Sequence, residues 1–95
     1  MRIEKGDVVI SLNGRDEGKR LLVVGTDGEY SELADGKGRR AEKPKRKKNK
    51  HLKPEGSIAG DLAQKLQSGE KATNNEIRRA LAQYAARRTE EGGMQ

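Results

Sequence analysis

The sequence predicts a mainly β fold, in which a small antiparallel barrel or sandwich is followed by a short helical extension. Short apolar runs alternate with glycine-rich turns at intervals of roughly ten residues through the first half of the chain. After Pro54 the composition changes to alanine, leucine, glutamine and charged residues with helical spacing. A chain of 95 residues has single-domain length, and within it we place the β part at residues 1–54 and the extension at residues 55–95.

The first predicted strand is the run at residues 8–12, in which Val8, Ile10 and Leu12 would share one face by the two-residue period. A turn follows at residues 13–19, because its two glycines and its asparagine tolerate positive φ. This strand and turn therefore begin an antiparallel hairpin.

The next elements continue the alternation of strand and turn. Residues 21–24 are apolar at every position, as expected for a strand at the buried centre of a small barrel. The Asp-Gly pair at residues 27–28 predicts a tight hairpin into a third strand at residues 30–34. A second glycine turn, residues 35–38, leads to a fourth strand at residues 39–43, which the following proline ends because proline cannot donate a ladder hydrogen bond.

The extension is predicted to hold two short helices. In the first helix, Ile58, Leu62 and Leu66 recur every four residues and would form the apolar stripe. Ser57 is the candidate cap at its start, and Gly69 is the candidate residue at its end.

The second helix is predicted to begin at a capping box formed by Thr73 and Glu76. Its apolar stripe would consist of Ile77, Leu81 and Tyr84. On its other side lie four arginines that would face RNA or solvent: Arg78, Arg79, Arg87 and Arg88. We expect the last residues, 90–95, to be frayed or disordered.

Positive charge is concentrated in one segment of the chain. The net charge is +6, and the whole excess of lysine and arginine over acidic residues lies within residues 1–54. Residues 39–53, which we call the basic arm, carry nine lysines and arginines against the single acid Glu42. Clustered positive charge attracts a polyanion, whereas scattered charge mainly keeps a protein soluble. The sequence therefore favours a nucleic acid as the partner.

The composition argues against several other classes of function. The absence of cysteine excludes disulfides, thiolate nucleophiles and cysteine-bound metal centres. Asp16 and Glu17 are adjacent and would point apart in a turn, and His51 is the only histidine, so neither a carboxylate pair nor a metal site is expected. We expect no enzymatic activity, no cofactor and no small-molecule substrate. No signal peptide or membrane span is apparent, so the expected location is the cytoplasm, with no membrane partner.

Residues 14–19 superficially suggest a phosphate-binding P-loop. The spacing between Gly14 and Gly18 is one residue too short for that motif, and Arg20 stands where a P-loop has serine or threonine. No helix pattern follows to present its N-terminus to a phosphate. A nucleotide site is therefore not expected.

A different pattern fits the same region. A Gly-Asp-Val-Val segment at residues 6–9 precedes an Arg-Asp-Glu-Gly-Lys segment at residues 15–19, and an apolar run follows. This arrangement resembles the KOW motif, which occurs in SH3-like barrels of ribosomal proteins and transcription elongation factors. The glycine of the motif corresponds to Gly18, where the turn needs a residue without Cβ.

The similarity continues along the chain, where it points to bacterial KOW-domain RNA-binding proteins related to large-subunit ribosomal proteins. It is carried further by residues 34–36, 42–45 and 50–52. Asn49 departs from the pattern, since an apolar residue is expected at this position. The resemblance implies an SH3-like barrel that binds ribosomal RNA on the large ribosomal subunit.

Together, the resemblance and the basic arm imply a non-catalytic protein that contacts the phosphate backbone of structured RNA. Lysine and arginine pair with phosphates and displace condensed counterions. The chain has two tyrosines and no phenylalanine or tryptophan, which favours reading of the backbone over stacking of unpaired bases. The expected RNA-binding residues are Arg15, Lys19, Arg20, Arg39, Arg40, Lys43, Lys45, Arg46, Lys47, Lys48, Lys50, His51 and Lys53.

Two other functions stay open at this level. A KOW domain can also be a protein-interaction module associated with the transcription or translation machinery, and a basic surface also suits architectural DNA binding. The scarcity of aromatic residues counts against a protein interface. Salt distinguishes the first alternative, because phosphate-driven binding weakens steeply with salt and an apolar interface does not.

Overall fold

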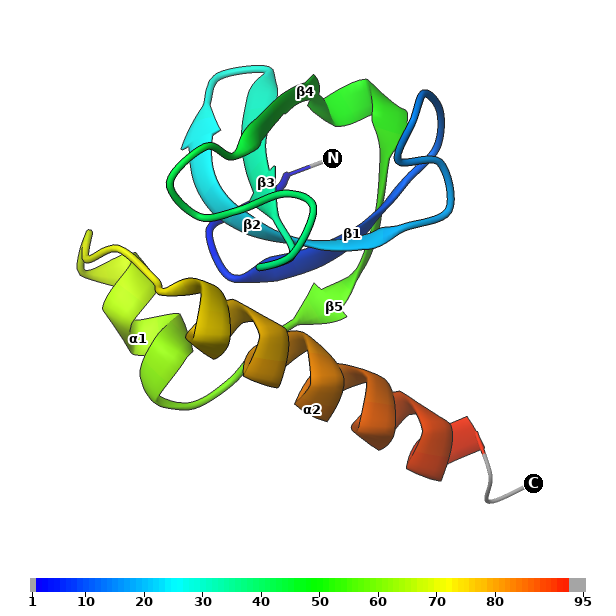
Figure 1. Ribbon diagram of the computed structural model, residues 1–95. Helices are drawn as coiled ribbons and strands as arrows, with labels where there is room; N and C mark the ends of the chain where they lie inside the picture. Colours follow the sequence, from blue (N-terminus) through cyan, green and yellow to red (C-terminus); the bar gives the residue numbers. More distant parts are fainter. Residues whose placement is uncertain (1, 93–95) are drawn as a thin grey trace.

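The computed structural model of the protein describes residues 2–92 (Figure 1). Within them, one antiparallel sheet has the spatial strand order β4-β3-β2-β1-β5. The strands are β1 (Asp7–Ser11), β2 (Arg20–Asp27), β3 (Tyr30–Ala34), β4 (Lys45–Lys48) and β5 (Leu52–Ser57). A 3-10 helix, η1 (Asn49–His51), joins β4 to β5, and the helices α1 (Asp61–Gln67) and α2 (Asn74–Gly92) follow. The predicted mainly β class with a helical extension is confirmed.

The sheet is strongly curved but is not a closed barrel (Figure 1). Neighbours follow the chain order from β1 to β4, so that each strand pairs with the one before it. β5 returns to pair with β1 on its other side. Since β4 and β5 are the two edges and no ladder joins them within residues 2–92, the closed barrel that the pattern predicted is not confirmed.

Apolar side chains are buried on both faces of this sheet. One cluster consists of Ile3, Val9, Leu21, Val23, Leu33 and Leu52. The other consists of Val8, Leu22, Ala34, Ile58, Leu66, Ile77 and Tyr84. β2 contributes to both clusters, as its apolar sequence predicted. The last four members of the second cluster follow β5, so the helical extension packs directly on the sheet.

The first predicted strand is confirmed as β1, but it ends one residue before the predicted Leu12. Val8 is buried, but Leu12 is 50% exposed and lies just beyond the end of β1. Val9 and Ser11 are buried as well. β1 lies between β2 and β5, and clusters cover both of its faces, so that a two-residue alternation cannot assign one face to the core.

The fourth strand is not at residues 39–43, where the sequence predicted it. The N–H of Arg39 donates to Oδ1 of Asp35 at 2.9 Å, and the N–H of Asp35 donates to the carbonyl of Arg39 at 2.8 Å. These bonds close a turn and occupy backbone groups that a strand ladder would need. β4 begins instead directly after Pro44, where the missing N–H is tolerated.

The first helix begins later than predicted. Ser57 belongs to β5 and pairs with Asp7 in β1, so it is not the cap. Gly60 precedes α1 instead, and the helix ends before Gly69 as predicted. β5 runs across the boundary expected after residue 54.

The second helix begins at the predicted capping box. The N–H of Glu76 donates to Oγ1 of Thr73 at 3.1 Å, and the N–H of Thr73 donates to Oε1 of Glu76 at 2.9 Å. α2 extends to Gly92, whereas the sequence led us to expect fraying from residue 90, and residues 93–95 lie outside the described part. No helix within residues 2–92 is long and apolar enough to cross a membrane.

Two glycines let α2 approach the sheet closely. Gly36 has a φ of +79°, and a Cβ there would lie 2.5 Å from the carbonyl oxygen of Asn74 and 2.8 Å from Cγ of Arg78. A Cβ on Gly56 in β5 would lie 2.8 Å from the hydroxyl of Tyr84. Larger side chains at these positions would push the helix away from the sheet.

Candidate nucleic-acid interface

The second half of the basic arm folds against the turn between β1 and β2. The Lys47 ammonium in β4 donates to Oγ of Ser11 at 2.8 Å and to the carbonyl of Asn13 at 2.6 Å. His51 Nδ1 lies 3.0 Å from Nδ2 of Asn13, and the His51 carbonyl accepts a hydrogen bond of 2.9 Å from the N–H of Leu12. Segments more than thirty residues apart in the chain therefore form one surface.

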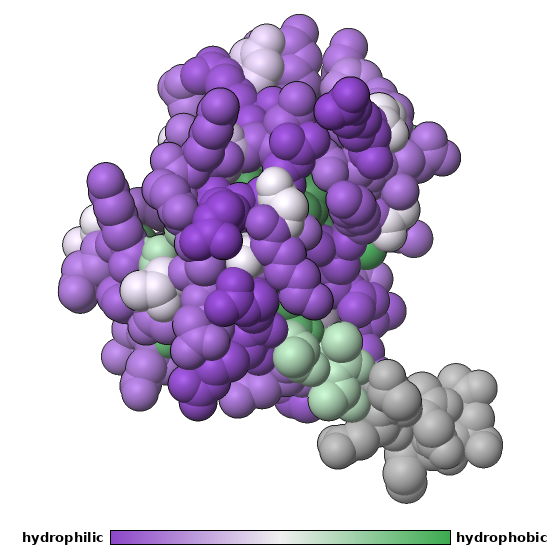
Figure 2. Space-filling model, viewed as in Figure 1, coloured by the Kyte–Doolittle hydropathy of each residue, from purple (hydrophilic) through white to green (hydrophobic). Residues whose placement is uncertain are grey.

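We call this surface, made of β4, η1 and residues 12–15, the basic edge. Its predicted RNA-binding residues are Arg15, Lys45, Arg46, Lys47, Lys48, Lys50 and His51. Lys53 follows in β5, and its side chain is exposed. Figure 2 shows one face of the molecule covered mostly by hydrophilic residues, with a few apolar ones in crevices and a small pale green patch next to the residues drawn in grey.

Five of the predicted residues have exposed side chains without an acidic partner among the described residues. They are Arg15, Lys43, Lys45, Lys50 and Lys53. Three of them belong to the basic edge, and Lys53 follows it directly. A cation that no carboxylate neutralises attracts a phosphate more strongly than one already held in an ion pair.

Arg39, by contrast, is committed to a buried carboxylate. Asp16 is 3% exposed, and its Oδ2 accepts hydrogen bonds from Nε and Nη2 of Arg39 at 3.0 and 2.8 Å. Lys19 Nζ lies 3.5 Å from the other oxygen. Burial raises the pKa of Asp16, but the hydrogen bonds and charge of Arg39, followed by those of Lys19, outweigh burial and leave that pKa below its usual value.

Arg20 is also engaged within the protein. Its Nε donates to Oε1 of Glu55 in β5 at 2.7 Å, and its guanidinium carbon lies 5.5 Å from the centre of the Tyr84 ring. Arg88 of α2 approaches the same carboxylate at 3.7 Å. Arg20 therefore joins the sheet to the helical extension and is less available to RNA than the sequence predicted.

Arg40 belongs to a small network that ties the loop at residues 39–44 to α2. Its Nε donates to Oε2 of Glu42 at 2.9 Å, and Nδ2 of Asn74 donates to the other oxygen at 2.6 Å. Oδ1 of Asn74 accepts from the N–H of Ala41 at 2.7 Å. The Arg40 guanidinium, followed by the Asn74 amide, lowers the pKa of Glu42 to about 2.

Arg46 and Lys48 lie beside Tyr30, on the neighbouring strand β3. The guanidinium carbon of Arg46 lies 4.2 Å from the ring centre, and the Lys48 ammonium lies 5.8 Å from it. Arg46 is also ion-paired with Asp27 at 3.2 Å. Tyr30 was not among the predicted site residues, because its proximity to two cations depends on the pairing of β3 with β4.

Gly18 has the conformation that the KOW-like motif requires. Its φ is +82°, and its N–H donates to the carbonyl of Ser11 at 2.8 Å. A Cβ there would meet no atom within 4 Å, so the backbone conformation, rather than a lack of space, calls for glycine.

Asn49, the departure from the KOW pattern, has a clear structural role. Its Oδ1 accepts a hydrogen bond of 2.6 Å from Oγ of Ser31, and its Nδ2 donates to the carbonyl of Gly28 at 3.4 Å. Ser31 is fully buried, and its hydroxyl needs a partner there. An amide at position 49 therefore serves a purpose that an apolar residue could not.

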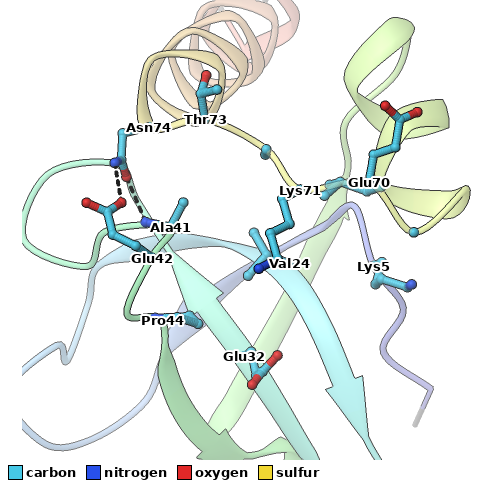
Figure 3. Close-up of a pocket in the computed structure, with 13 residues that line it drawn as sticks. Lys5, Val24, Glu32, Ala41, Glu42, Pro44, Glu70, Lys71, Thr73 and Asn74 are labelled. Atoms are coloured by element: carbon cyan, nitrogen blue, oxygen red, sulfur yellow. Dashed lines mark hydrogen bonds between the residues drawn. The ribbon is translucent and has the colours of Figure 1, made fainter.

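A cleft of about 600 Å³ lies between the loop at residues 39–44, the sheet and the α1–α2 connection (Figure 3). It is lined by acidic and basic side chains alike: Lys5, Glu32, Glu42, Glu70 and Lys71. Within residues 2–92, no three histidine, aspartate or glutamate side chains are placed to hold a metal ion. Because its charges are mixed, the cleft is a poorer anion site than the basic edge.

Comparisons with known proteins add no family assignment. No protein-family model matches the chain, and no curated protein is similar to it. The resemblance to KOW-domain proteins therefore rests on the motif residues themselves.

Proposed function

We propose that the protein binds structured RNA, specifically ribosomal RNA of the large subunit, and that it does so without catalysing a reaction. Contact is made with the phosphate backbone through the basic edge and the lysines next to it. The RNA supplies the negative charge that the surface attracts, and each lysine or arginine that pairs with a phosphate displaces condensed counterions.

The observation that carries this proposal is the group of exposed cations without a described acidic partner, Arg15, Lys43, Lys45, Lys50 and Lys53. Arg39 and Arg20 bind carboxylates within the protein. Fewer residues are therefore available to RNA than the thirteen expected from the sequence. What remains exposed is a set of cations on the basic edge and in the segments next to it.

We also propose that the sheet is a KOW domain of the SH3-like kind. The meander of four strands, with β5 returning to β1 after a 3-10 turn, supports this assignment. The conformation of Gly18 and the position of the KOW-like residues in β1, the following turn and the start of β2 support it further.

Salt titration of binding tests the proposal. The affinity for a fragment of large-subunit ribosomal RNA should fall steeply as salt is raised, since counterion release drives the association. Lys50→Glu/Lys53→Glu should reduce the slope of log affinity against log salt by about two, one for each lost phosphate contact.

The matched control is Lys37→Glu/Lys71→Glu, which changes the charge equally at exposed positions outside the basic edge. It should leave the slope nearly unchanged. Affinity that is insensitive to salt would point to a protein-interaction module instead. A tagged protein that stays wholly in the light fractions of a low-salt gradient, away from ribosomal particles, would exclude ribosomal RNA.

A further inference from the structure

Tyr30 is the one tyrosine of the chain that is not committed to the core. The sequence has two tyrosines and no phenylalanine or tryptophan, and Tyr84 is 7% exposed within an apolar cluster. Tyr30 is partly exposed at the start of β3. Figure 1 shows β4 and the β2–β3 hairpin at the end of the molecule opposite α2. An aromatic ring in that position contributes little to the core and can instead support a side chain at the surface.

Arg46 is stacked on this ring and is held in place. Its guanidinium carbon lies 4.2 Å from the centre of the Tyr30 ring, and its Nη1 lies 3.2 Å from Oδ2 of Asp27. The Arg46 side chain is 56% exposed. With one face of the guanidinium toward the ring, this exposed fraction leaves part of the guanidinium accessible from solvent. A flat cation of this kind stacks on nucleobases, as aromatic rings do.

The acid opposite Arg46 does not block this face. Glu32 pairs with Arg46 across the strands, yet its carboxylate lies against β2, where a Cβ on Gly25 would collide with it. Gly25 therefore leaves room for the Glu32 carboxylate to turn toward β2. No ion pair between Glu32 and Arg46 is present within the described residues.

A hollow next to the stack can take the rest of a nucleotide. It has a volume of about 370 Å³ and is lined by Gly28, Glu29, Lys48, Asn49 and Lys50. Lys48 reaches both sites, since its ammonium also lies 5.8 Å from the Tyr30 ring centre. Lys48 and Lys50 outnumber the one acid of the hollow, Glu29, and supply positive charge for a phosphate, beside a plane on which a base can stack.

We propose that Tyr30 and Arg46 form a stacking site for one unpaired nucleobase of the bound RNA, whose phosphate lies at Lys48 and Lys50. The inference rests on the proposed RNA binding and adds a preference to it: an RNA with an unpaired base next to a helix is bound more tightly than a continuous helix. The scarcity of aromatic residues limits this type of contact to one place, and most contacts remain with the backbone.

The test compares two RNA hairpins that have the same stem, one fully paired and one with a single bulged adenosine. Arg46→Lys keeps the positive charge but removes the planar guanidinium on which a base can stack. It should weaken binding of the bulged hairpin about tenfold, which is the size of effect expected for losing one base-stacking contact. Binding of the fully paired hairpin should not change.

Arg2→Lys is the matched control. The Arg2 side chain is exposed and lies 3.8 Å from Glu4, so it also has an acidic neighbour, but it is not among the expected RNA-binding residues, and no aromatic ring lies over it in the described residues. This variant should bind both hairpins as the wild type does. As a second readout, the Hε resonance of Arg46, assigned by its loss in Arg46→Lys, should move upfield with the bulged hairpin alone.

The outcomes separate this inference from the function on which it rests. Equal binding of both hairpins by the wild type, or a preference for the bulge that Arg46→Lys leaves intact, would overturn the stacking site while RNA binding stands. If the wild type binds neither hairpin at low salt, the proposed function fails, and the stacking site fails with it.

Discussion

Asp16 illustrates how one side chain determines the role of its neighbours. It lies inside the KOW-like segment, next to Glu17, and the two side chains have opposite environments, since Asp16 is buried and Glu17 is exposed. A buried carboxylate needs a cationic or hydrogen-bonding partner. Arg39 supplies it from a different turn, 23 residues away along the chain, and this fixes the loop at residues 35–39 against the first turn.

Arg39→Ala should therefore reduce the stability of the fold rather than act mainly on RNA binding. The change leaves the Asp16 carboxylate buried with only Lys19 nearby, at a cost of about 2 kcal/mol in the free energy of unfolding. Urea denaturation followed by circular dichroism measures this cost. Arg2→Ala, at an 88% exposed position where the guanidinium lies 3.8 Å from Glu4, should change the stability little. Equal effects of the two substitutions would contradict the structural role of Arg39.

At the scale of elements, β4 shows how the geometry of a strand gives similar residues different environments. The four residues of the strand, Lys45–Lys48, are all basic, and the sequence offers no means of ranking them. Alternation sends Lys45 and Lys47 to one face and Arg46 and Lys48 to the other. Lys47 reaches across to Ser11 and Asn13, while Lys45 remains exposed. The edge strand is therefore held partly by one of the cations that were expected to bind RNA.

Lys47→Met should destabilise the protein by about 1 kcal/mol, because the buried Ser11 hydroxyl and the Asn13 carbonyl lose a charged donor. Lys45→Met, which removes the same charge from the same face of β4, should leave the thermal midpoint nearly unchanged. The same pair of variants should show the reverse order in RNA affinity, with the larger loss for Lys45→Met. Identical melting curves for the two variants would show that the Lys47 contacts do not hold β4.

At the scale of the whole molecule, the sheet and the helices share one apolar cluster. The cluster formed by Val8, Leu22 and Ala34 is completed by Ile77 and Tyr84 from α2. Carboxylates strengthen the same connections: Glu42 bonds to Asn74 at the start of α2, and Glu76 bonds to the N–H of Thr73 and to Lys65 of α1. The Thr73 N–H, followed by the Lys65 ammonium, lowers the pKa of Glu76.

Stability should therefore decrease in acid. A carboxyl with a lower pKa in the folded than in the unfolded state stabilises the fold above the unfolded pKa, and this contribution is lost as the pH falls through the folded pKa. The pKa values of Asp16, Glu42 and Glu76 are all lowered, so the free energy of unfolding should fall from about pH 5 downward. Thermal midpoints recorded across this range provide the measurement.

In the same pH series, the thermal midpoint of Glu76→Gln should fall less steeply than that of the wild type, because one of the three carboxyls with a lowered pKa is absent. A thermal midpoint that stays constant between about pH 5 and about pH 2 would contradict the carboxylate contributions.

Local patterns in the sequence were enough to identify the class of the fold and several of its turns and helix ends. The apolar run of β2, the Asp-Gly hairpin at residues 27–28 and the Thr73–Glu76 capping box all depend on contacts within a few residues, so neighbouring residues suffice to predict them. The positive φ of Gly18 belongs to the same category. The concentration of positive charge in the basic arm was likewise visible without any structure.

The remaining features depend on residues far apart in the chain, and only the tertiary structure decided them. The position of β1 between β2 and β5 buried both of its faces. Hydrogen bonds to Asp16 and Glu55 hold Arg39 and Arg20 within the fold, so these two arginines are less available to RNA than the other cations. The pairing of β3 with β4 placed Arg46 on Tyr30. Sequence alone established that the chain carries clustered positive charge, whereas long-range contacts determined which of those charges remain exposed.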